Sequence, residues 1–157
     1  MEQIINPEVF NQIAEVELIY RSKVKSSERP KITQSKDAYL IFKNRWDENK
    51  IELQEQFKVM FLNRANKVLG IYEMSTGGIT STVVDIKLIF SAALKACASG
   101  LILSHNHPSN NLKPSRDDEQ LTSKIKSAGT FLDIQLMDHI ILGSEEGYYS
   151  FADEGLL

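Results

Sequence analysis

Cysteine is scarce in this sequence, with Cys97 as the single thiol in 157 residues. One cysteine excludes an internal disulfide, which agrees with a reducing compartment. It also excludes the Pro-Cys-x-x-Cys zinc ligands of the nucleobase deaminases. Cys97 continues an apolar helical pattern, so we expect it to be a buried packing residue and not a nucleophile. The other members of that pattern are Ile86, Ile89, Phe90, Ala93 and Leu94.

The sequence also lacks a long apolar run. No stretch approaches the roughly 20 apolar residues that a membrane-spanning helix needs. The first ten residues, MEQIINPEVF, carry an acid and have neither a basic start nor an apolar core, so they do not predict a signal peptide. We therefore expect a cytoplasmic chain without membrane contact. Because 42% of the residues are hydrophobic and 25% charged, we expect a globular chain with one domain over residues 1–157.

An excess of positive charge is missing as well. The chain has 18 basic and 21 acidic residues, a net charge of −3, which argues against a nucleic-acid binder that uses its whole surface. One segment is nevertheless basic, with Glu28 as its only acid. Such a run is usually a solvated loop, and the alternative is a contact with phosphates or an acidic partner, so we expect nucleic-acid binding to be weak if it occurs. The basic residues are Arg21, Lys23, Lys25, Arg29 and Lys31.

Local patterns predict an α/β fold in which helices flank a mixed β-sheet. Residues 1–30 are predicted to hold a short helix that starts at Asn6-Pro7, a strand from Val16 to Tyr20 and the basic loop. The metal core is predicted over about residues 54–143, at the edge of the sheet where the strand that carries two histidines ends. Predicted helices start at Ser35 (ending near Asn49-Lys50), at Asp85 (ending at Cys97) and at Ser115; predicted strands cover residues 57–61, 68–72, 101–107, 134–142 and 148–151.

Two histidines follow a buried strand. The apolar run from Leu101 to Leu103 has the length of such a strand, and Ser104-His105-Asn106-His107 continues it. Successive side chains on a strand point to opposite faces, so His105 and His107 project the same way and can reach one ion. Pro108 stops the strand and leaves the second histidine at its C-terminal end.

A third candidate ligand follows after a loop. Asp118 falls in the first turn of the helix that starts at Ser115, where a carboxylate is favoured electrostatically and can face the histidines. The pair also resembles a capping box, an ordinary way to start a helix, and a lone His-x-His is more often a pair of half-buried polar residues than a pair of ligands. The full pattern is stronger than its parts, because two imidazoles and one carboxylate make the set of a catalytic zinc site with a fourth position for water.

This spacing, His105-x-His107 followed by Ser115 and Asp118, resembles the signature of the JAMM (MPN+) metalloproteases. The motif as it stands here, HNHPS…PSxxD, resembles their bacterial RadC branch. The resemblance covers about residues 16–157, including Asp138-His139-Ile140-Ile141. It implies the JAB1/MPN fold, a mixed sheet flanked by helices in a layout related to the cytidine deaminases. RadC-like sequences usually have glycine where this chain has Asn110, and asparagine is the residue that best tolerates a left-handed backbone in its place.

The resemblance also implies an activity. One Zn²⁺ per chain, held by His105, His107 and Asp118, would activate water for hydrolysis of a peptide or isopeptide bond in a protein substrate. Ser115 would donate a hydrogen bond to the developing oxyanion. A glutamate upstream of the histidines would act as general base. Glu73 stands five residues before a glycine, as the RadC pattern has it, and is the candidate; Glu52 and Glu55 fit that position less well.

Two other interpretations use the same residues. Non-haem iron oxygenases also combine two histidines with a carboxylate, but adjacent histidines with a distant aspartate match JAMM better. The main alternative is a DNA-repair-associated or partner-binding module in which the zinc is structural or idle, and the basic segment is the feature that would support it. His139 has no ligand spacing and is predicted to be a core residue or to support a ligand.

Overall fold

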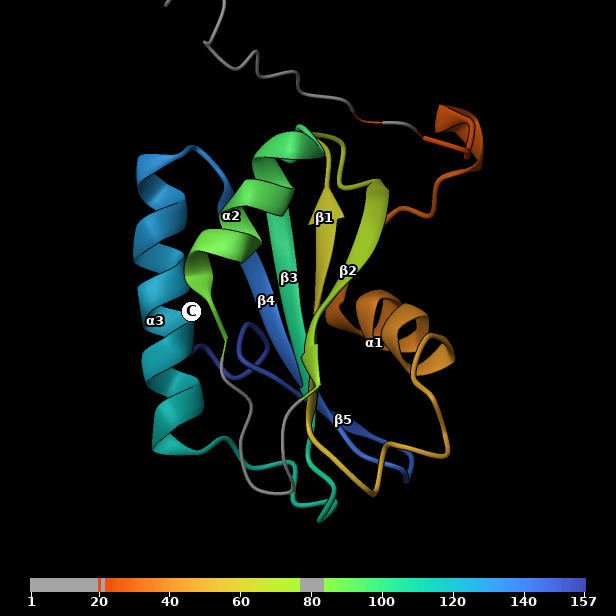
Figure 1. The fold of residues 1–157 in the computed structure, drawn as a ribbon, viewed down its shortest axis with the longest axis vertical. Coiled ribbons are helices and arrows are strands. Elements are labelled where there is room, and N and C mark those ends of the chain that lie inside the picture. Colours follow the sequence, from red (N-terminus) through yellow and green to blue (C-terminus); the bar gives the residue numbers. More distant parts are fainter. Residues whose placement is uncertain (1–19, 21, 77–83) are drawn as a thin grey trace, which may run out of the picture.

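One sheet with helices on both faces forms the core of the protein (Figure 1). The structure, a computed structural model, describes Tyr20, residues 22–76 and residues 84–157. Its five strands run in the order β2-β1-β3-β4-β5. The helix expected from Asn6, most of the strand expected from Val16, Arg21 and the glycines after Thr76 lie outside the described residues.

The strand that carries the histidines, β3 (Gly100–Asn106), lies in the middle of the sheet. Every residue of β3 is buried, because the strand is covered on both faces, as its continuous apolar run predicts. It pairs antiparallel with β1 (Gln56–Leu62) and parallel with β4 (Gln135–Leu142). The sheet is completed by the antiparallel strands β2 (Val68–Thr76) and β5 (Tyr148–Ser150). The predicted mixed sheet is therefore confirmed.

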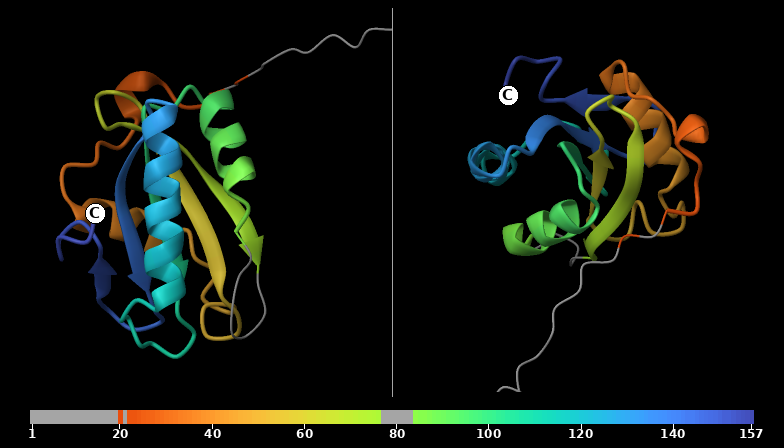
Figure 2. Two further views of the ribbon diagram at one scale, coloured as in Figure 1. Left: turned by 90° about the vertical axis from the view of Figure 1, so that its left-hand side faces the viewer. Right: turned by 90° about the horizontal axis from the view of Figure 1, so that it is seen from above.

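The helices form the outer two of three layers (Figure 2). Helices α2 (Ile86–Lys95) and α3 (Arg116–Phe131) pack on one face of the sheet, and α1 (Ser35–Asn44) packs on the other. A short 3₁₀ helix, η2 (Ser26–Glu28), lies in the basic segment. Each face has its own apolar core, since alternate strand residues point to opposite sides. Phe57, Val59, Leu101, Leu103, Ile89, Phe90 and Ile125 belong to the α2/α3 side, and Met60, Leu62, Ile102, Ile140, Tyr39 and Phe42 to the α1 side. No helix among the described residues has the length and apolar character needed to cross a membrane.

Two helix ends differ from the prediction. Helix α1 is capped by Gln34, which forms a capping box with Asp37, and it ends at Asn44 well before the expected Asn49-Lys50. Helix α2 ends at Lys95, so the prediction of Cys97 as a buried helical residue is wrong. Cys97 has φ 52° and is exposed. Its amide donates to Leu94 and that of Ala98 to Ala93, a Schellman ending that turns the left-handed residue outward.

Helix α3 forms the crossover from β3 to the parallel strand β4. Near its C-terminal end α3 approaches the start of β4 so closely that a Cβ atom on Gly129 would lie 2.3 Å from the carbonyl oxygen of Ile134. Gly129 is buried, and an added Cβ atom would also meet the ring of Phe90 at 3.6 Å. A side chain at Gly129 would therefore collide with the chain where it leaves α3 and enters β4.

We expect Gly129→Ala to destabilise the protein by about 1–3 kcal/mol, because the backbone carbonyl cannot move away from an added methyl group. Helix propensity alone would give the opposite sign, about 1 kcal/mol of stabilisation. Gly70→Ala is the matched control, since nothing lies within 4 Å of a Cβ atom there. Urea unfolding measures both variants. Equal stability of Gly129→Ala and wild type would show that the helix does not depend on this close approach.

Candidate metal centre

The histidine strand presents both imidazoles on the α2/α3 side of the sheet. His105 lies opposite Phe57 in the β1–β3 pairing and is 1% exposed. His107 follows β3, and its backbone amide still donates to Leu142 on β4, so its side chain keeps the alternation. Asn106 between them points to the other side, where its amide group donates to the carbonyls of Ile51 and Gln54. The predicted common direction of the two histidines is confirmed.

The first turn of α3 holds the carboxylate beside them. Ser115 is the N-cap: its hydroxyl accepts from the Asp118 amide at 3.2 Å, and its own amide and hydroxyl both donate to Asp118 Oδ2 at 2.7 Å. The capping box is therefore confirmed, and it orients the carboxylate. Asp118 Oδ1 lies 3.2 Å from His105 Nε2, and Oδ2 lies 3.7 Å from His107 Nε2. The predicted three residues converge, with one ligand atom of each within 4.8 Å of the others.

The hydrogen bond between His107 Nδ1 and the loop after β3 sets the tautomer of the His107 ring. Its Nδ1 contacts the carbonyl oxygen of Asn111, which can only accept, so Nδ1 carries the proton of the neutral ring. His107 Nε2 then directs a lone pair at His105 Nε2, 3.0 Å away, and at the carboxylate. Such a cluster of nitrogen and oxygen acceptors needs a cation between its members, either a proton or a metal ion. The donor set fits a tetrahedral metal with three protein ligands.

Charge in the centre is arranged to keep the carboxylate ionised. Burial would raise the pKa of Asp118, but in the metal-free centre the carboxylate accepts a hydrogen bond whenever Nε2 of His105 or His107 carries a proton, and this holds its pKa far below the usual range. Burial would lower the pKa of His107, but the bonds to Asp118 and to the Asn111 carbonyl outweigh this, and the pKa lies above the ordinary 6.5. Of this pair, His107 is therefore the group at which protons compete with a metal ion.

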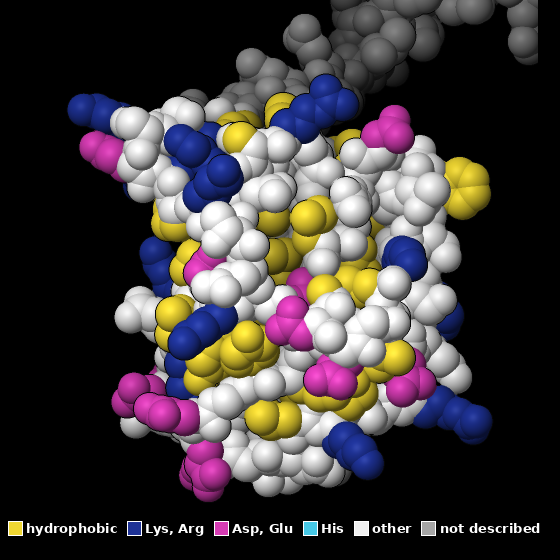
Figure 3. Space-filling view, turned by 180° about the vertical axis from the view of Figure 1, so that it is seen from behind, with side chains coloured by type: hydrophobic (Ala, Val, Ile, Leu, Met, Phe, Trp, Pro, Cys, Tyr) yellow, Lys and Arg dark blue, Asp and Glu magenta, His cyan; other side chains and the backbone are white. Residues whose placement is uncertain are grey.

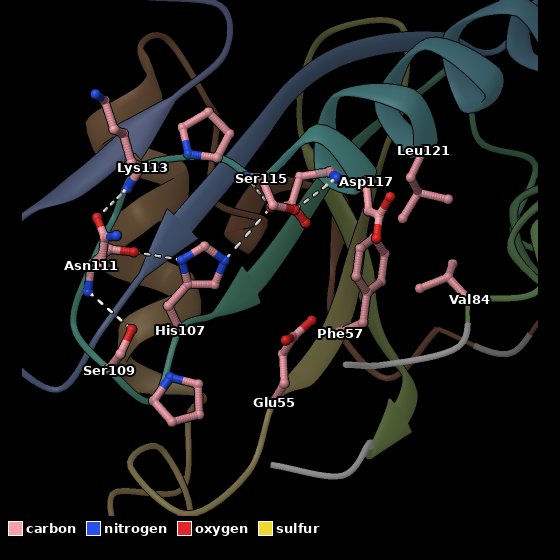
Figure 4. Close-up of a pocket in the computed structure, with 13 residues that line it drawn as sticks. Glu55, Phe57, Val84, His107, Ser109, Asn111, Lys113, Ser115, Asp117 and Leu121 are labelled. Atoms are coloured by element: carbon pink, nitrogen blue, oxygen red, sulfur yellow. Dashed lines mark hydrogen bonds and ion pairs between the residues drawn. The ribbon is translucent and has the colours of Figure 1, made fainter. Parts of the chain in front are cut away.

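The centre opens into a cleft of about 780 Å³ (Figure 4). Phe57, Val84 and Leu121 form an apolar wall on one side of His107, and the loop that carries Ser109, Asn111 and Lys113 forms the other. The carboxylate of Glu55 points into the cleft below His107, and its charge contributes to the raised pKa of that histidine. The full lining is Glu55, Phe57, Val84, His107, Pro108, Ser109, Asn111, Lys113, Pro114, Ser115, Asp117, Asp118 and Leu121.

Comparison with known protein families agrees with this geometry. Residues 32–156 match the family model described as RadC-like JAB domain. The chain belongs to this family. A UPF0758 protein of Flavobacterium johnsoniae is 49% identical over 126 residues, which make up 80% of this chain and 53% of that protein. UPF0758 proteins of Porphyromonas gingivalis and Chlorobaculum parvum are 44% and 37% identical over 66% and 93% of this chain. The chain spans about half to two thirds of the length of these relatives.

The structure does not bring Glu73 to the centre of this RadC-like domain. Its Oε2 lies 2.9 Å from Nζ of Lys58, and its Oε1 accepts from Gln56 at 3.3 Å. Lys58 is the neighbour of Phe57 and points to the α1 side, where it lies 4.7 Å from the ring centroid of Trp46. Because His105 and Phe57 point to the other side, the sheet separates Glu73 from the two histidines.

Glu55 is the carboxylate that lines the cleft, whereas the spacing in the sequence favoured Glu73. It precedes β1 by one residue and has the same alternation as Phe57, the partner of His105. The start of β1 therefore lies beside the end of β3, and Glu55 reaches the cleft from there. The signal in the sequence was the spacing of Glu55 and Phe57, but it gains meaning only with the antiparallel pairing of β1 and β3, which the local patterns did not predict.

Asn110 meets the expectation for the loop of this RadC-like domain. Its φ is 59°, the left-handed conformation that asparagine tolerates in place of glycine. The backbone amide donates to the carbonyl of His107, and the side chain donates to Ser144 Oγ at 2.8 Å. The substitution therefore keeps the left-handed turn and adds a tie to the β4–β5 connection.

The basic segment lies at the opposite end of the sheet. Lys31 pairs with Lys67 next to the β1–β2 turn, at the top of Figure 1, whereas the loop after β3 is at the bottom. Seen from behind, Lys and Arg side chains gather over this corner (Figure 3). Arg29 donates to Ser22 Oγ, and Lys23, Lys25 and Lys31 are exposed. None of the described basic residues of the segment lines the cleft.

The affinity of this centre for a metal ion, measured with Zn²⁺ as the probe, should fall by about tenfold for each unit of pH below the pKa of His107, because one proton must leave that ring before the ion binds. Since the pKa of His107 is raised, the loss should begin above pH 6.5. Asp118 should not contribute to it, because its pKa is lowered. Competition with a chromophoric chelator between pH 5.5 and 8.5 measures the slope. Constant affinity from pH 8 to pH 6 would contradict the assignment of His107 as a ligand.

Proposed function

We propose that this domain is a zinc-dependent hydrolase of the JAMM type that cleaves a peptide or isopeptide bond in a protein substrate. The observation that carries the proposal is the convergence of His105, His107 and Asp118 beside an open cleft, which is lined by the last two and by a further carboxylate, Glu55. Three ligands leave one position of a tetrahedral ion for water or substrate. Membership in the RadC-like JAB family supports the same class of chemistry.

The donor set of the centre suits zinc. His105 and His107 would supply neutral nitrogen, and Asp118 a charged oxygen that stays ionised. Zinc in such a set acts as a Lewis acid that acidifies water and polarises a carbonyl group. Ser115 keeps the carboxylate in place through its amide and hydroxyl, so the same helix start that brings Asp118 to the centre also orients it.

We assign the general base to Glu55 in place of Glu73. Glu55 reaches the cleft beside His107, whereas Glu73 is held by Lys58 on the other side of the sheet. The Glu55 carboxylate would accept the proton of the attacking water and return it to the leaving nitrogen. This role requires no rearrangement of the sheet, because Glu55 immediately precedes β1, at the end of the β1–β3 pairing that also positions His105.

Ser115 would take part through its hydroxyl. In the structure this hydroxyl donates to Asp118 Oδ2 and accepts from the Asp118 amide. The residue also lines the cleft. When the carboxylate is neutralised by a cation, rotation about the Cβ–Oγ bond would direct the proton toward a developing oxyanion without breaking the cap to the amide. Ser115 would thus combine the structural and the catalytic roles.

Glu55→Gln should lower the rate of hydrolysis by about 10²–10⁴-fold and leave zinc content unchanged, because the amide keeps its size and cannot accept the proton. Glu73→Gln is the matched control: it removes the countercharge of Lys58, so it should lower stability and not the rate. Both variants are assayed for bound zinc and for cleavage of a panel of peptides and isopeptide-linked proteins. Equal losses in the two variants would exclude Glu55 as the specific base, and no cleavage by wild type across the panel would contradict the proposed activity.

The basic segment supports a second candidate function, a module that binds an acidic partner or DNA. Lys23, Lys25 and Lys31 are exposed with Glu28 as the acid among them, and they lie far from the cleft along the sheet. So few charges can release only a few counterions, so any binding to duplex DNA should be weak and should disappear on raising salt from 50 to 200 mM. Fluorescence anisotropy with a labelled duplex measures it. Tight binding that resists salt would place this function above hydrolysis.

A further inference from the structure

We propose that Thr122 and His139 are positioning residues that set the tautomer of His105, so that its Nε2 lone pair is directed at the metal centre. The inference rests on the proposed metal site and concerns the residues that orient one of its ligands. It concerns residues on three different elements: His105 on β3, His139 on β4 and Thr122 on α3.

A continuous chain of short polar contacts joins these residues. His105 Nδ1 lies 2.8 Å from His139 Nε2, and His139 Nδ1 lies 2.7 Å from Thr122 Oγ1. Thr122 Oγ1 in turn lies 2.6 Å from the backbone carbonyl oxygen of Asp118. His139 and Thr122 are 0% and 2% exposed, so water does not replace these partners. The chain starts and ends at ligand residues, Asp118 through its backbone and His105 through its ring.

The direction of the protons follows from the carbonyl at one end. A carbonyl oxygen only accepts, so the single hydroxyl proton of Thr122 is donated to Asp118. Thr122 Oγ1 must then accept from His139, which places the ring proton of His139 on Nδ1. Its Nε2 is left as an acceptor, so Nδ1 of His105 carries a proton and donates it in a hydrogen bond to His139 Nε2. A neutral His105 therefore has its lone pair on Nε2, the atom that lies 3.2 Å from Asp118 Oδ1.

Ring packing and a backbone hydrogen bond fix the orientation of the His139 side chain. Its ring stacks on Phe151 at 4.8 Å with an interplanar angle of 15°, and the edge of Phe57 meets it at 5.8 Å. Its backbone amide donates to Asp138 Oδ1 at 2.7 Å. The ring is 0% exposed, and so complete a burial disfavours a charged imidazole, so the ring is neutral and has one proton to place. Apolar stacking fixes the plane of the ring, and Thr122 decides which nitrogen is protonated.

The alternative tautomer would leave the centre without one of its ligands. If Thr122 offered no acceptor, His139 would avoid a buried N–H without a partner by moving its proton to Nε2. That proton would point at His105 Nδ1, which would become the acceptor, and His105 Nε2 would carry the proton where the metal belongs. Partners that orient a ligand histidine commonly change metal affinity by about 10–100-fold when removed.

Thr122→Val and Thr122→Ser in the full chain form a matched pair that tests this chain of contacts. Valine keeps the shape and removes the hydroxyl, whereas serine keeps the hydroxyl. We expect zinc affinity, measured by chelator competition at pH 8, to fall about 10–100-fold in Thr122→Val and to return to near the wild-type value in Thr122→Ser. Ring ¹⁵N chemical shifts of the metal-free protein should show the Nδ1–H form of His105 in wild type and Thr122→Ser, and the Nε2–H form in Thr122→Val.

The two readouts separate this inference from the proposed function. Wild-type ¹⁵N shifts report the tautomer whether or not the protein cleaves any substrate. An unchanged tautomer in Thr122→Val would overturn the inference, even if zinc affinity fell, because the loss would then be a packing effect. If Thr122→Val does not fold, His139→Gln and His139→Leu replace it: the glutamine amide can accept from His105 and should preserve the Nδ1–H form, whereas leucine should not. The same tautomer in both would equally overturn the inference.

Discussion

The convergence of three acceptor atoms, His105 Nε2, His107 Nε2 and a carboxylate oxygen of Asp118, is the constraint on which the rest of the structure depends. Atoms with lone pairs repel one another at 3.0–3.7 Å unless a cation lies between them, so the surrounding structure must hold them there. Complete burial of β3 fixes the histidine strand, and the capping box fixes the carboxylate. Cores on both faces of the sheet thus serve to keep a polar cluster in one arrangement.

The local part of the centre could be predicted from the sequence, because its geometry follows from short-range periodicity. His105 and His107 share a strand face, and Ser115 and Asp118 share a first helical turn, whatever the rest of the chain does. The mixed sheet and the order of its elements also followed from local patterns and from the family resemblance. Asn110 likewise has the left-handed backbone expected of it.

The non-local part could not be predicted. Glu55 precedes β1 and Glu73 lies within β2, and the pairing partner of β1 and the bulge between Phe57 and Lys58 decide which of them reaches the cleft. Nothing in the sequence near Glu73 shows that it faces a buried lysine, since Lys58 lies on another strand. Cys97 was misplaced for a similar reason: the helix pattern continues through it, but the chain must turn at that point to enter β3. Tertiary contacts overrode periodicity in both places.

The most direct test of the metal centre is a crystal of the zinc-loaded chain measured on both sides of the zinc absorption edge. The account predicts one anomalous peak per chain, at about 2.0–2.2 Å from His105 Nε2, His107 Nε2 and a carboxylate oxygen of Asp118. The Glu55 carboxylate should lie within hydrogen-bond reach of the open side of that peak, and Glu73 should still contact Lys58. A peak that lies elsewhere, or bound zinc that persists in the His105→Ala/His107→Ala double variant, would contradict the account.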